Sequence, residues 1–284
     1  VPSVQFTRSG ASGLFFVRGV GTTNAAVGEE GSNALYVDGV YMPDLAQTVN
    51  NFNNIDRIEV LKGPQGTLFG RNATGGLIHV ITREPGDETV FQSQIGYGNY
   101  ETVNAKAYIA TPVSDNLAVD LALTRTDQND GWGKNITLDR KNKIQSFWGA
   151  RSKAVFTPTD RLKFVVAGDY YENEDNITLG YQVAPGTVNA GGATTPDGWW
   201  DTTLDNYPMT RQKIWGVSLT GEIDLDFATL TSITAHRKSR NQSSFDVDGA
   251  PAPLLNIGFV SGGKSIQQEV RLASRSVTPF SWQL

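Results

Sequence analysis

The chain of 284 residues contains no cysteine, which excludes disulfide bonds, thiolate zinc sites and cysteine nucleophiles. Its two histidines, His79 and His236, are far apart in sequence and no HExxH motif is present, so no metal site is predicted. No run approaches about 18 consecutive apolar residues, which excludes a transmembrane helix but leaves open strands that cross a membrane. The net charge of −5 lacks the basic excess typical of proteins that bind nucleic acid, so no such partner is expected.

Glycine is abundant, and it gathers within "RIEVLKGPQGTLFGRNATGGLIHVITREP" at residues 57–85. A phosphate-binding P-loop requires Gly, four residues and then Gly-Lys-Ser/Thr, which "GRNATGGL" does not supply. A dinucleotide fingerprint requires GxGxxG before a helix, and the closest glycine pairs, at 19–21 and 63–66, lack that spacing. We therefore expect no cofactor and no catalytic residue here, but tight turns in a compact domain. The candidate turn residues are Gly19, Gly39, Gly63, Pro64, Gly66, Gly70, Gly75 and Gly76.

The residue pattern of the sequence changes near residue 86, where "REPGDE" at 83–88 is a plausible linker. Beyond it, apolar residues alternate with small or polar ones, as in "LAVDLALTR" at 117–125, where every second residue is leucine or valine. This period of two predicts strands with one face of apolar residues and one face of small or polar residues. About eight such strands are expected. Their ranges are 89–99, 101–111, 117–125, 145–156, 162–170, 213–223, 227–240 and 265–274.

The connections between these expected strands alternate between short and long. Loops of roughly 18 to 40 residues follow Thr126, Tyr171 and Arg240, and long loops are uncommon in compact soluble domains. Short turns on one rim and long loops on the other are typical of an outer-membrane barrel. A soluble sandwich or propeller does not require every second connection to be short, so the pattern favours the barrel. The tight turns are expected at 111–116, 157–160 and 224–227.

Three blocks of the N-terminal region resemble the plug domain of TonB-dependent outer-membrane receptors. They are "LFFVRGVG" (14–21), "ALYVDGVYM" (34–42) and "DRIEVLKGPQGTLFGRNATGGLIHVITREP" (56–85). A later segment, "KSIQQEVRLAS" at 264–274, is similar to a barrel strand of the same family. The resemblance implies a small α/β plug inside an antiparallel transmembrane barrel of about 22 strands. We therefore predict a plug at residues 1–85 and the N-terminal part of the barrel at residues 86–284.

The resemblance also implies a function, which is the active uptake of a scarce ligand across the bacterial outer membrane. Its implied partners are the TonB protein with its inner-membrane energising complex, outer-membrane lipid and lipopolysaccharide, and a small ligand. Ferric siderophores, haem, cobalamin and saccharides are all carried by this family, and the sequence does not choose among them. Two alternatives stay open. One is a ligand sensor of the same architecture with a further signalling domain, and the other is a soluble β-rich enzyme, for which we find no catalytic grouping.

The family's TonB box, the first part of its plug and more than half of its barrel have no counterpart in these residues. We therefore expect a piece of a longer protein. A partial barrel would have two unpaired edges, which favour aggregation. On this basis we expect that the 284 residues transport nothing by themselves.

Contacts between plug and barrel can be assigned from the resemblance. In the family, basic residues of the "RG" and "(R/K)GP" blocks hold the plug to acidic residues of the barrel wall. The matching positions are Arg18 and Lys62, and Glu269 in "QQEVRL" is the candidate acidic partner. Since lysine cannot form the bidentate ion pair of arginine with a carboxylate, the contact of Lys62 with the wall is expected to be weaker than an arginine contact.

The long loops are the expected site of ligand recognition. The segment 172–210 carries six acidic residues and neither lysine nor arginine, so a negative field is expected there. Such a field disfavours an anionic ferric catecholate and suits a neutral or cationic ligand or divalent cations. Tryptophans beside aspartates suit stacking on a ring-shaped ligand. A basic run, "HRKSR", falls where a strand is expected to emerge at the outer rim and suits lipopolysaccharide phosphates. The ligand candidates are Trp132, Trp199, Trp200, Asp197 and Asp201, and the lipopolysaccharide candidates are Arg237, Lys238 and Arg240.

Overall fold

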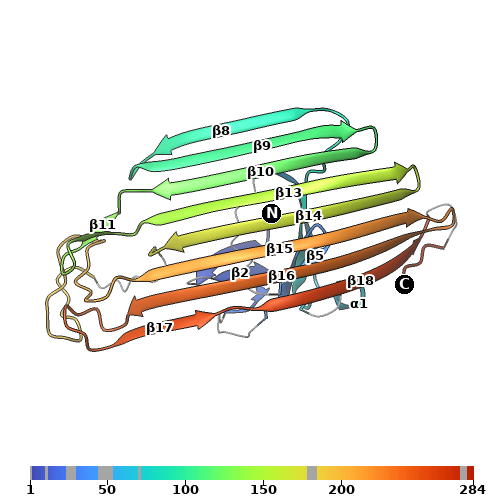
Figure 1. Cartoon of the computed structure of the whole chain (residues 1–284). Helices are drawn as coiled ribbons and strands as arrows, with labels where there is room; N and C mark the ends of the chain where they lie inside the picture. Colours follow the sequence, from blue (N-terminus) through green and yellow to red (C-terminus); the bar gives the residue numbers. More distant parts are fainter. Residues whose placement is uncertain are drawn as a thin grey trace.

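The structure is a computed structural model that describes residues 2–9, 12–23, 30–43, 54–69, 72–177, 184–275 and 280–284. A nine-stranded antiparallel sheet forms one layer, and two small sheets from the N-terminal region lie behind it in Figure 1. We call the large sheet the wall and the two small sheets the plug.

The wall strands follow one another in chain order from β8 to β16, and β17 and β18 both pair with β16. All eight expected strands are confirmed, and β17 is an additional strand that alternation did not reveal. The bounds are β8 (Val90–Gly98), β9 (Thr102–Ser114), β10 (Leu117–Gln128), β13 (Gln145–Thr159), β14 (Leu162–Asp175), β15 (Met209–Asp224), β16 (Ala228–Asp246), β17 (Asn256–Ser261) and β18 (Lys264–Ser274).

Several wall strands are longer than the alternation predicted. The clearest case is β16, which has 19 residues and continues to Asp246, although the expected strand ended at residue 240. Short turns join β9 to β10, β13 to β14 and β15 to β16 at one end of the wall, and the long connections gather at the other end (Figure 1). We call these the short-turn end and the long-loop end. Two short strands, β11 (Gly133–Asn135) and β12 (Arg140–Asn142), lie in the connection after β10.

The plug consists of a three-stranded and a four-stranded sheet, in which only β4 and β7 are parallel. Its described helical content is the single turn α1 (Gly66–Phe69). No helix in the described part of the chain is long and apolar enough to cross a membrane. The strands are β1 (Val4–Ser9), β2 (Ser12–Val17), β3 (Val20–Gly21), β4 (Asn33–Val37), β5 (Val40–Tyr41), β6 (Ile55–Lys62) and β7 (Gly76–Thr82).

The main core lies between plug and wall. Two wall residues of β16, Ile233 and Ala235, are buried together with apolar side chains of β4, β5 and β7. Burial of apolar surface is worth about 25 cal/mol per Å², so this shared core holds the two parts together. The plug members of the core are Leu35, Val37, Val40, Met42, Ile78 and Val80.

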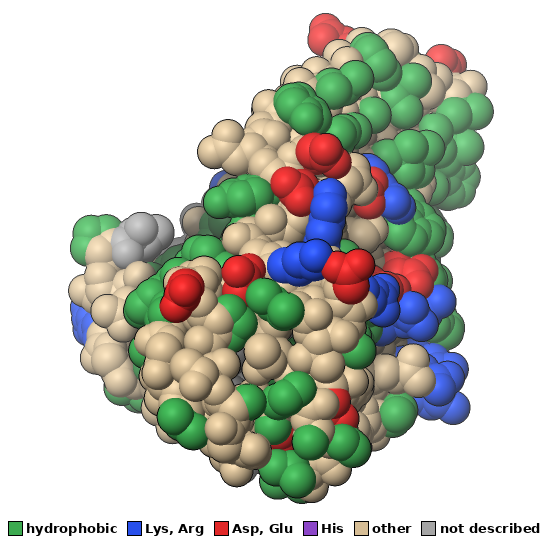
Figure 2. All heavy atoms as spheres, turned by 90° about the vertical axis from the view of Figure 1, so that its left-hand side faces the viewer, with side chains coloured by type: hydrophobic (Ala, Val, Ile, Leu, Met, Phe, Trp, Pro, Cys, Tyr) green, Lys and Arg blue, Asp and Glu red, His purple; other side chains and the backbone are tan. Residues whose placement is uncertain are grey.

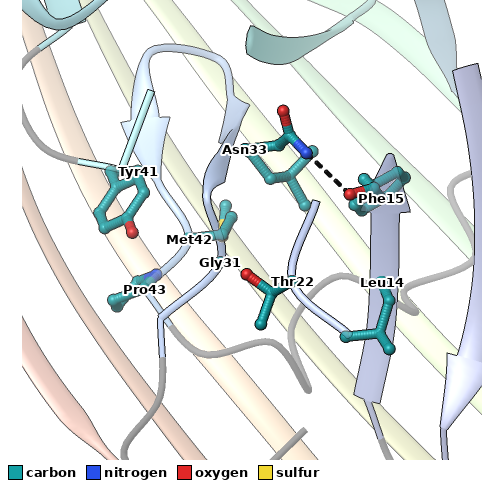
Figure 3. A pocket seen from close by; sticks show the side chains of 9 residues that line it. Leu14, Phe15, Thr22, Gly31, Asn33, Tyr41, Met42 and Pro43 are labelled. Carbon is teal, nitrogen blue, oxygen red and sulfur yellow. Dashed lines mark hydrogen bonds between the residues drawn. The ribbon is translucent and has the colours of Figure 1, made fainter. Parts of the chain in front are cut away.

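Within the plug, Asn33 connects the two small sheets. Its side-chain amide donates to the backbone oxygens of Phe15 and Val20, both at 2.8 Å, and Figure 3 draws the bond to Phe15. The crevice beside it, which Thr22 and Met42 also line, has a volume of about 10 Å³. That is the room of about one water molecule, so the crevice is too small for a transported ligand.

Candidate functional site

Two hairpins of the plug have the same local sequence, Val-X-Gly-Val. The first joins β2 to β3 through Arg18 and Gly19, and the second joins β4 to β5 through Asp38 and Gly39. All four residues have positive φ, at 53° and 80° in the first turn and 49° and 80° in the second. Two consecutive residues of positive φ are the mark of a type I′ turn, for which Asp-Gly is a favoured pair because glycine adopts this conformation without strain.

The second hairpin places Asp38 against the wall. Its carboxylate forms ion pairs with Arg151 and Lys153, neighbours on the plug-facing side of β13, and the distance from Lys153 Nζ to Asp38 Oδ1 is 3.2 Å. Thr82 at the end of β7 donates its backbone N–H and its hydroxyl to the same carboxylate, each at 2.8 Å. We call Asp38, Thr82, Arg151 and Lys153 the Asp38 cluster.

The cluster is buried, and Arg151 Nε is its one buried side-chain nitrogen without a hydrogen-bond partner among the described residues. The side chains of Arg151 and Lys153 are 6% and 2% exposed, and that of Asp38 is 17% exposed. Lys153 Nζ also donates to the backbone oxygen of Thr82 at 3.0 Å. Burial alone would raise the pKa of Asp38, but Arg151, Lys153 and Thr82 outweigh it and lower that pKa below its ordinary value of 3.8. Asp38 is therefore an anion in the interface and the ion-pair partner of two buried wall cations.

His79 supports the turn that carries Asp38. Its Nε2 accepts the backbone N–H of Gly39 at 3.0 Å, so the ring is a neutral acceptor on this side. Its Nδ1 lies 3.7 Å from Glu59 Oε2. Burial lowers the pKa of His79 below 6.5, and the attraction of Glu59 and Asp38 only partly offsets this effect. A proton on Nε2 would face the N–H of Gly39 and remove this hydrogen bond.

A second contact joins the strand after this turn to the wall. The side-chain amide of Gln267 in β18 donates to the backbone oxygen of Tyr41 at 2.8 Å and accepts its N–H at 3.1 Å. The amide thereby satisfies both polar backbone groups of Tyr41, as a neighbouring strand would. A third contact is the ion pair between Lys163 Nζ and Glu84 Oε2 at 2.5 Å, with side chains 31% and 46% exposed. Exposed pairs of this kind contribute little, so the Asp38 cluster is the principal polar contact.

The structure does not pair the residues that the resemblance assigned to the contact between plug and wall. Arg18 is exposed at the first hairpin, and Lys62 donates to the backbone oxygen of Pro2 at 3.1 Å within the plug. Glu269 is paired with Arg271 of its own strand at 2.8 Å. The structure brings none of the three together, and the buried ion pair has its acid on the plug and its bases on the wall.

Sequence reasoning missed Asp38, Thr82, Arg151 and Lys153. A signal was present for two of them, because Arg151 and Lys153 are two residues apart and therefore share one face of β13. Two cations on the face that otherwise carries small or apolar residues require a buried counter-charge. The sequence does not reveal that this charge is Asp38, which is 113 positions away.

Seven of the eight predicted turn residues of the plug are described, and they lie in turns, at strand ends or at the start of α1. Gly63 has a φ of 94° at the end of β6, and its N–H donates to the oxygen of Gly75 at 3.1 Å. Pro64 follows it, Gly66 begins α1, and Gly76 begins β7. Gly70 lies outside the described residues.

The long-loop end brings some of the predicted ligand residues together. Trp132 and Trp200 pack edge to face with ring centres 5.4 Å apart. Asp201 accepts the backbone N–H of Lys134 at 2.8 Å, so it ties two loops together instead of facing a ligand. Trp199 is 59% exposed and Asp197 is exposed. Figure 2 views the molecule from this end and shows side chains of every kind mixed over the loops.

The negative field expected for segment 172–210 is weaker than its composition indicates. Glu172 and Glu174 belong to β14 and form ion pairs with Lys213 and Arg211 of β15, at 3.0 Å and 2.7 Å. Asp175 is buried at the end of the same strand. The other three acidic residues of the segment, Asp197, Asp201 and Asp205, belong to the loop itself, so the negative field is reduced but not removed.

One of the three residues predicted to contact lipopolysaccharide faces the other way. Arg237 is 4% exposed on the plug-facing side of β16 and forms a two-pronged ion pair with Asp169, at 2.8 Å and 2.9 Å. The prediction was wrong because the strand does not end at residue 240, so Arg237 lies well inside it. Lys238 and Arg240 lie one and three residues after Arg237 in the same strand, so their side chains point to the opposite, outward face.

Comparison with known proteins gives three consistent findings. Residues 1–77 match the family model of the TonB-dependent Receptor Plug Domain. The pesticin receptor of Yersinia enterocolitica is 32% identical over 98 residues, which are 34% of this chain and 14% of that receptor. The catecholate siderophore receptor Fiu of Escherichia coli is 27% identical over 133 residues, which are 45% of this chain and 17% of that receptor.

A solved structure resembles nearly the whole chain. The crystal structure of the ferric yersiniabactin uptake receptor FyuA from Yersinia pestis matches with a TM-score of 0.81 at 20% identity, over 98% of this chain and 42% of that one. At this identity the likeness establishes the fold of plug and wall together. The matched segments span less than a fifth of the two curated relatives' own lengths.

Proposed function

Because the chain is a member of the TonB-dependent receptors, with a plug domain and barrel strands of that family, we propose that it serves the energised uptake of a ferric siderophore. Proteins of this family are receptors of the bacterial outer membrane and not enzymes. The plug would close the barrel at rest and would move when ligand and the TonB protein act on it together. The division into a plug at 1–85 and barrel at 86–284 remains part of this proposal.

The observation that carries the gating part of the proposal is the Asp38 cluster. It joins the tip of a plug hairpin to β13 of the wall through a buried anion between two buried cations. Breaking such a pair by displacement costs energy, because it takes from the buried Arg151 and Lys153 the carboxylate with which both form ion pairs. A contact of this kind keeps the plug in place until work is done on it, which is the property that a closed, energy-dependent gate requires.

The ligand class is inferred from the names of the relatives and from the loops. Two of the three compared proteins are named for siderophores, a catecholate in one case and ferric yersiniabactin in the other. The long-loop end presents Trp199 and Trp200 with exposures of 59% and 38%, and aromatic rings suit the aromatic groups of many iron chelators. Since Glu172 and Glu174 are paired, their charges do not repel an anionic ferric complex.

The proposal is tested by uptake of radioactive iron in a strain that lacks every other siderophore receptor. The receptor that carries this chain is supplied on a plasmid, and ferric catecholate, ferric phenolate, ferric hydroxamate, haem and cobalamin are offered in turn. We expect accumulation of iron from at least one ferric siderophore, and its loss when the TonB gene is deleted. Uptake of haem or cobalamin alone would contradict the ligand class, and uptake that persists without TonB would contradict the mechanism.

A further inference from the structure

The plug-facing side of the wall carries a row of buried charges beside the Asp38 cluster. Arg151 of β13 lies directly opposite Asp169 of β14. Beyond Asp169 the row continues through Gly216 of β15 to Arg237 of β16. The side chains of Arg151, Asp169 and Arg237 are 6%, 8% and 4% exposed. One buried carboxylate of the wall therefore lies between two buried guanidinium groups.

Gly216 allows Arg237 to reach across β15. The Nη1 and Nη2 atoms of Arg237 donate to Asp169 at 2.8 Å and 2.9 Å, although the strand β15 lies between the two residues. A Cβ at position 216 would collide with Arg237 Nη1 and would lie 2.9 Å from its Cζ. The guanidinium of Arg237 therefore occupies the space that a side chain at position 216 would fill.

Asp169 retains hydrogen-bonding capacity for Arg151. An ionised carboxylate offers about four acceptor positions on its two oxygens, and Arg237 takes one on each oxygen. Residues directly opposite each other on antiparallel strands have Cβ atoms about 4.5 to 5.5 Å apart, so Arg151 can reach Asp169 by a change of rotamer. Asp169 already attracts Arg151 in the closed arrangement, but Asp38 attracts it more strongly.

Lys153, the second cation of the Asp38 cluster, also lies beside a carboxylate of the wall. Its backbone N–H donates to Oδ1 of Asp120 in β10 at 2.5 Å, and Asp120 is 4% exposed. The buried charges around the hairpin tip thus comprise three cations, which all belong to the wall, and three carboxylates, of which only Asp38 belongs to the plug. When Asp38 withdraws, the three cations share the two carboxylates of the wall.

We propose that Asp169 is a second counter-ion for Arg151 and takes over its guanidinium when the Asp38 hairpin leaves the wall. The two carboxylates compete for one arginine, which pairs with Asp38 while the plug is closed and with Asp169 while the plug is displaced. Because a buried cation without a partner is costly, this exchange lowers the free energy of the displaced state and makes the displacement easier to reverse. The inference rests on the plug movement in the proposed function, but not on the ligand or on the TonB protein.

The test uses the receptor that carries this chain, with Ala34→Cys in the plug core, where residue 34 is 2% exposed, as the site of thiol labelling. The labelling rate at a fixed urea concentration reports how often the plug opens. The measured quantity is the factor by which Asp38→Ala raises this rate, and it is determined in the intact receptor and in the Asp169→Asn variant. We expect this factor to be about tenfold larger in Asp169→Asn, because Arg151 then lacks its carboxylate partner on β14.

A charge-balanced variant separates the exchange from a general change in electrostatic potential. Asp169→Asn/Arg237→Gln removes one carboxylate and one guanidinium, so the net charge of the row stays the same while Arg151 still lacks its second partner. We expect the same enlarged factor as in Asp169→Asn. A factor equal to that of the intact receptor, in either variant, would overturn the proposal.

Two further variants complete the test. Gly216→Ala pushes Arg237 away from Asp169 without a change of charge, so Asp169 becomes more available to Arg151 and the factor is expected to fall below that of the intact receptor. Glu172→Gln is the control, because Glu172 is a carboxylate of β14 that forms its ion pair with β15 on the outward face, and we expect an unchanged factor. An enlarged factor in either variant would contradict the exchange. The heat-dependent shift of folded barrels in gel electrophoresis verifies that the variants are folded. Since neither ligand nor the TonB protein is present, failure of the exchange and failure of the uptake proposal give different results.

Discussion

The two plug hairpins have the same turn and opposite surroundings. Arg18 and Asp38 occupy the same place in their Val-X-Gly-Val turns, with φ of 53° and 49°. Arg18 is exposed and has no ion pair with another described residue, whereas Asp38 is 17% exposed and contacts Arg151 and Lys153. The comparison teaches that four residues determine the turn, while the surface opposite the turn determines what its tip residue does.

The largest expected effect on plug stability comes from removing the Asp38 carboxylate. Asp38→Ala removes the ion-pair partner of the buried Arg151 and Lys153, which costs about 3 to 5 kcal/mol of plug stability. Arg18→Ala removes an exposed charge and is expected to change that stability by less than about 0.5 kcal/mol. Because this chain has no cysteine, Ala34→Cys in the plug core, where residue 34 is 2% exposed, supplies a site for thiol labelling that reports plug unfolding in urea.

If Asp38→Ala and Arg18→Ala lowered plug stability by similar amounts, the two hairpins would not differ in their contact with the wall. Asp38→Asn serves as a further control, because it keeps the shape of the side chain and loses only the charge. It is expected to be destabilised nearly as much as Asp38→Ala, since both wall cations lose their ion-pair partner in the plug.

The second effect in size concerns the glycines of the two turns. Both have a φ of 80°, so an alanine at either position is strained by about 1 kcal/mol. A Cβ at Gly39 would also lie 2.9 Å from Ile233 Cδ1, whereas a Cβ at Gly19 would meet nothing within 4 Å. We expect Gly39→Ala to destabilise the plug by about 1 kcal/mol more than Gly19→Ala in the same urea titration.

A rescue variant separates contact with the wall from strain in the turn. Ile233→Val removes the Cδ1 atom that the new Cβ would meet. We expect Ile233→Val to lower plug stability less in the Gly39→Ala background than in the intact protein. Additive costs would mean that the second hairpin does not press against the wall at this point.

The third effect is a pH dependence that belongs to the second hairpin only. Below pH 6.5 the unfolded chain binds a proton at His79 that the native plug resists, because the native pKa is lowered, so stability falls as the pH falls. The charged groups that act on His79 are Glu59, Asp38, Arg57 and Arg271. The contribution of Asp38 is lost only below its own lowered pKa, outside this range. We expect a lower urea midpoint at pH 5.5 than at pH 7.5.

His79→Gln is the matched variant for this effect. The glutamine oxygen is able to accept the N–H of Gly39, and the side chain does not titrate. The midpoints of this variant at the two pH values are expected to lie closer together than those of the intact protein. An unchanged difference would assign the pH dependence to another group.

A further effect on plug stability is expected at the strand after the second turn. Gln267→Ala removes two hydrogen bonds to the backbone of Tyr41 and is expected to cost about 1 to 2 kcal/mol. Gln268→Ala is the control, because Gln268 lies on the outward face and bonds only to exposed partners such as Thr234 and Ser232. Equal effects on plug stability would show that Gln267 does not support the hairpin.

The sequence predicted the wall better than the site, and the reason is physical. Alternation with a period of two is local, so it revealed all eight long strands and the short turns between them. It underestimated the length of β16, because polar residues on both faces beyond residue 240 conceal the alternation. That error placed Arg237 at the rim, although it is buried against Asp169.

The site depended on contacts that local patterns do not contain. Val-Arg-Gly-Val and Val-Asp-Gly-Val both predict a turn, and nothing within either motif says which tip meets a charged partner. Asp38 and Arg151 are 113 positions apart, and their meeting depends on how the plug lies against the wall. The resemblance to a family supplied the architecture, but its residue assignments for Arg18 and Glu269 did not transfer to the contacts of this chain.

The central claim is that Asp38 holds the plug to the wall through Arg151. It is tested most directly by a double-mutant cycle, in which the plug stability of Asp38→Ala, Arg151→Ala and the double variant is measured by urea titration with thiol labelling. We predict a coupling energy of about 1 to 3 kcal/mol for this pair. The same cycle on Arg18 and Glu269 is predicted to be additive within about 0.5 kcal/mol. Additivity for Asp38 and Arg151, or coupling between Arg18 and Glu269, would contradict the account.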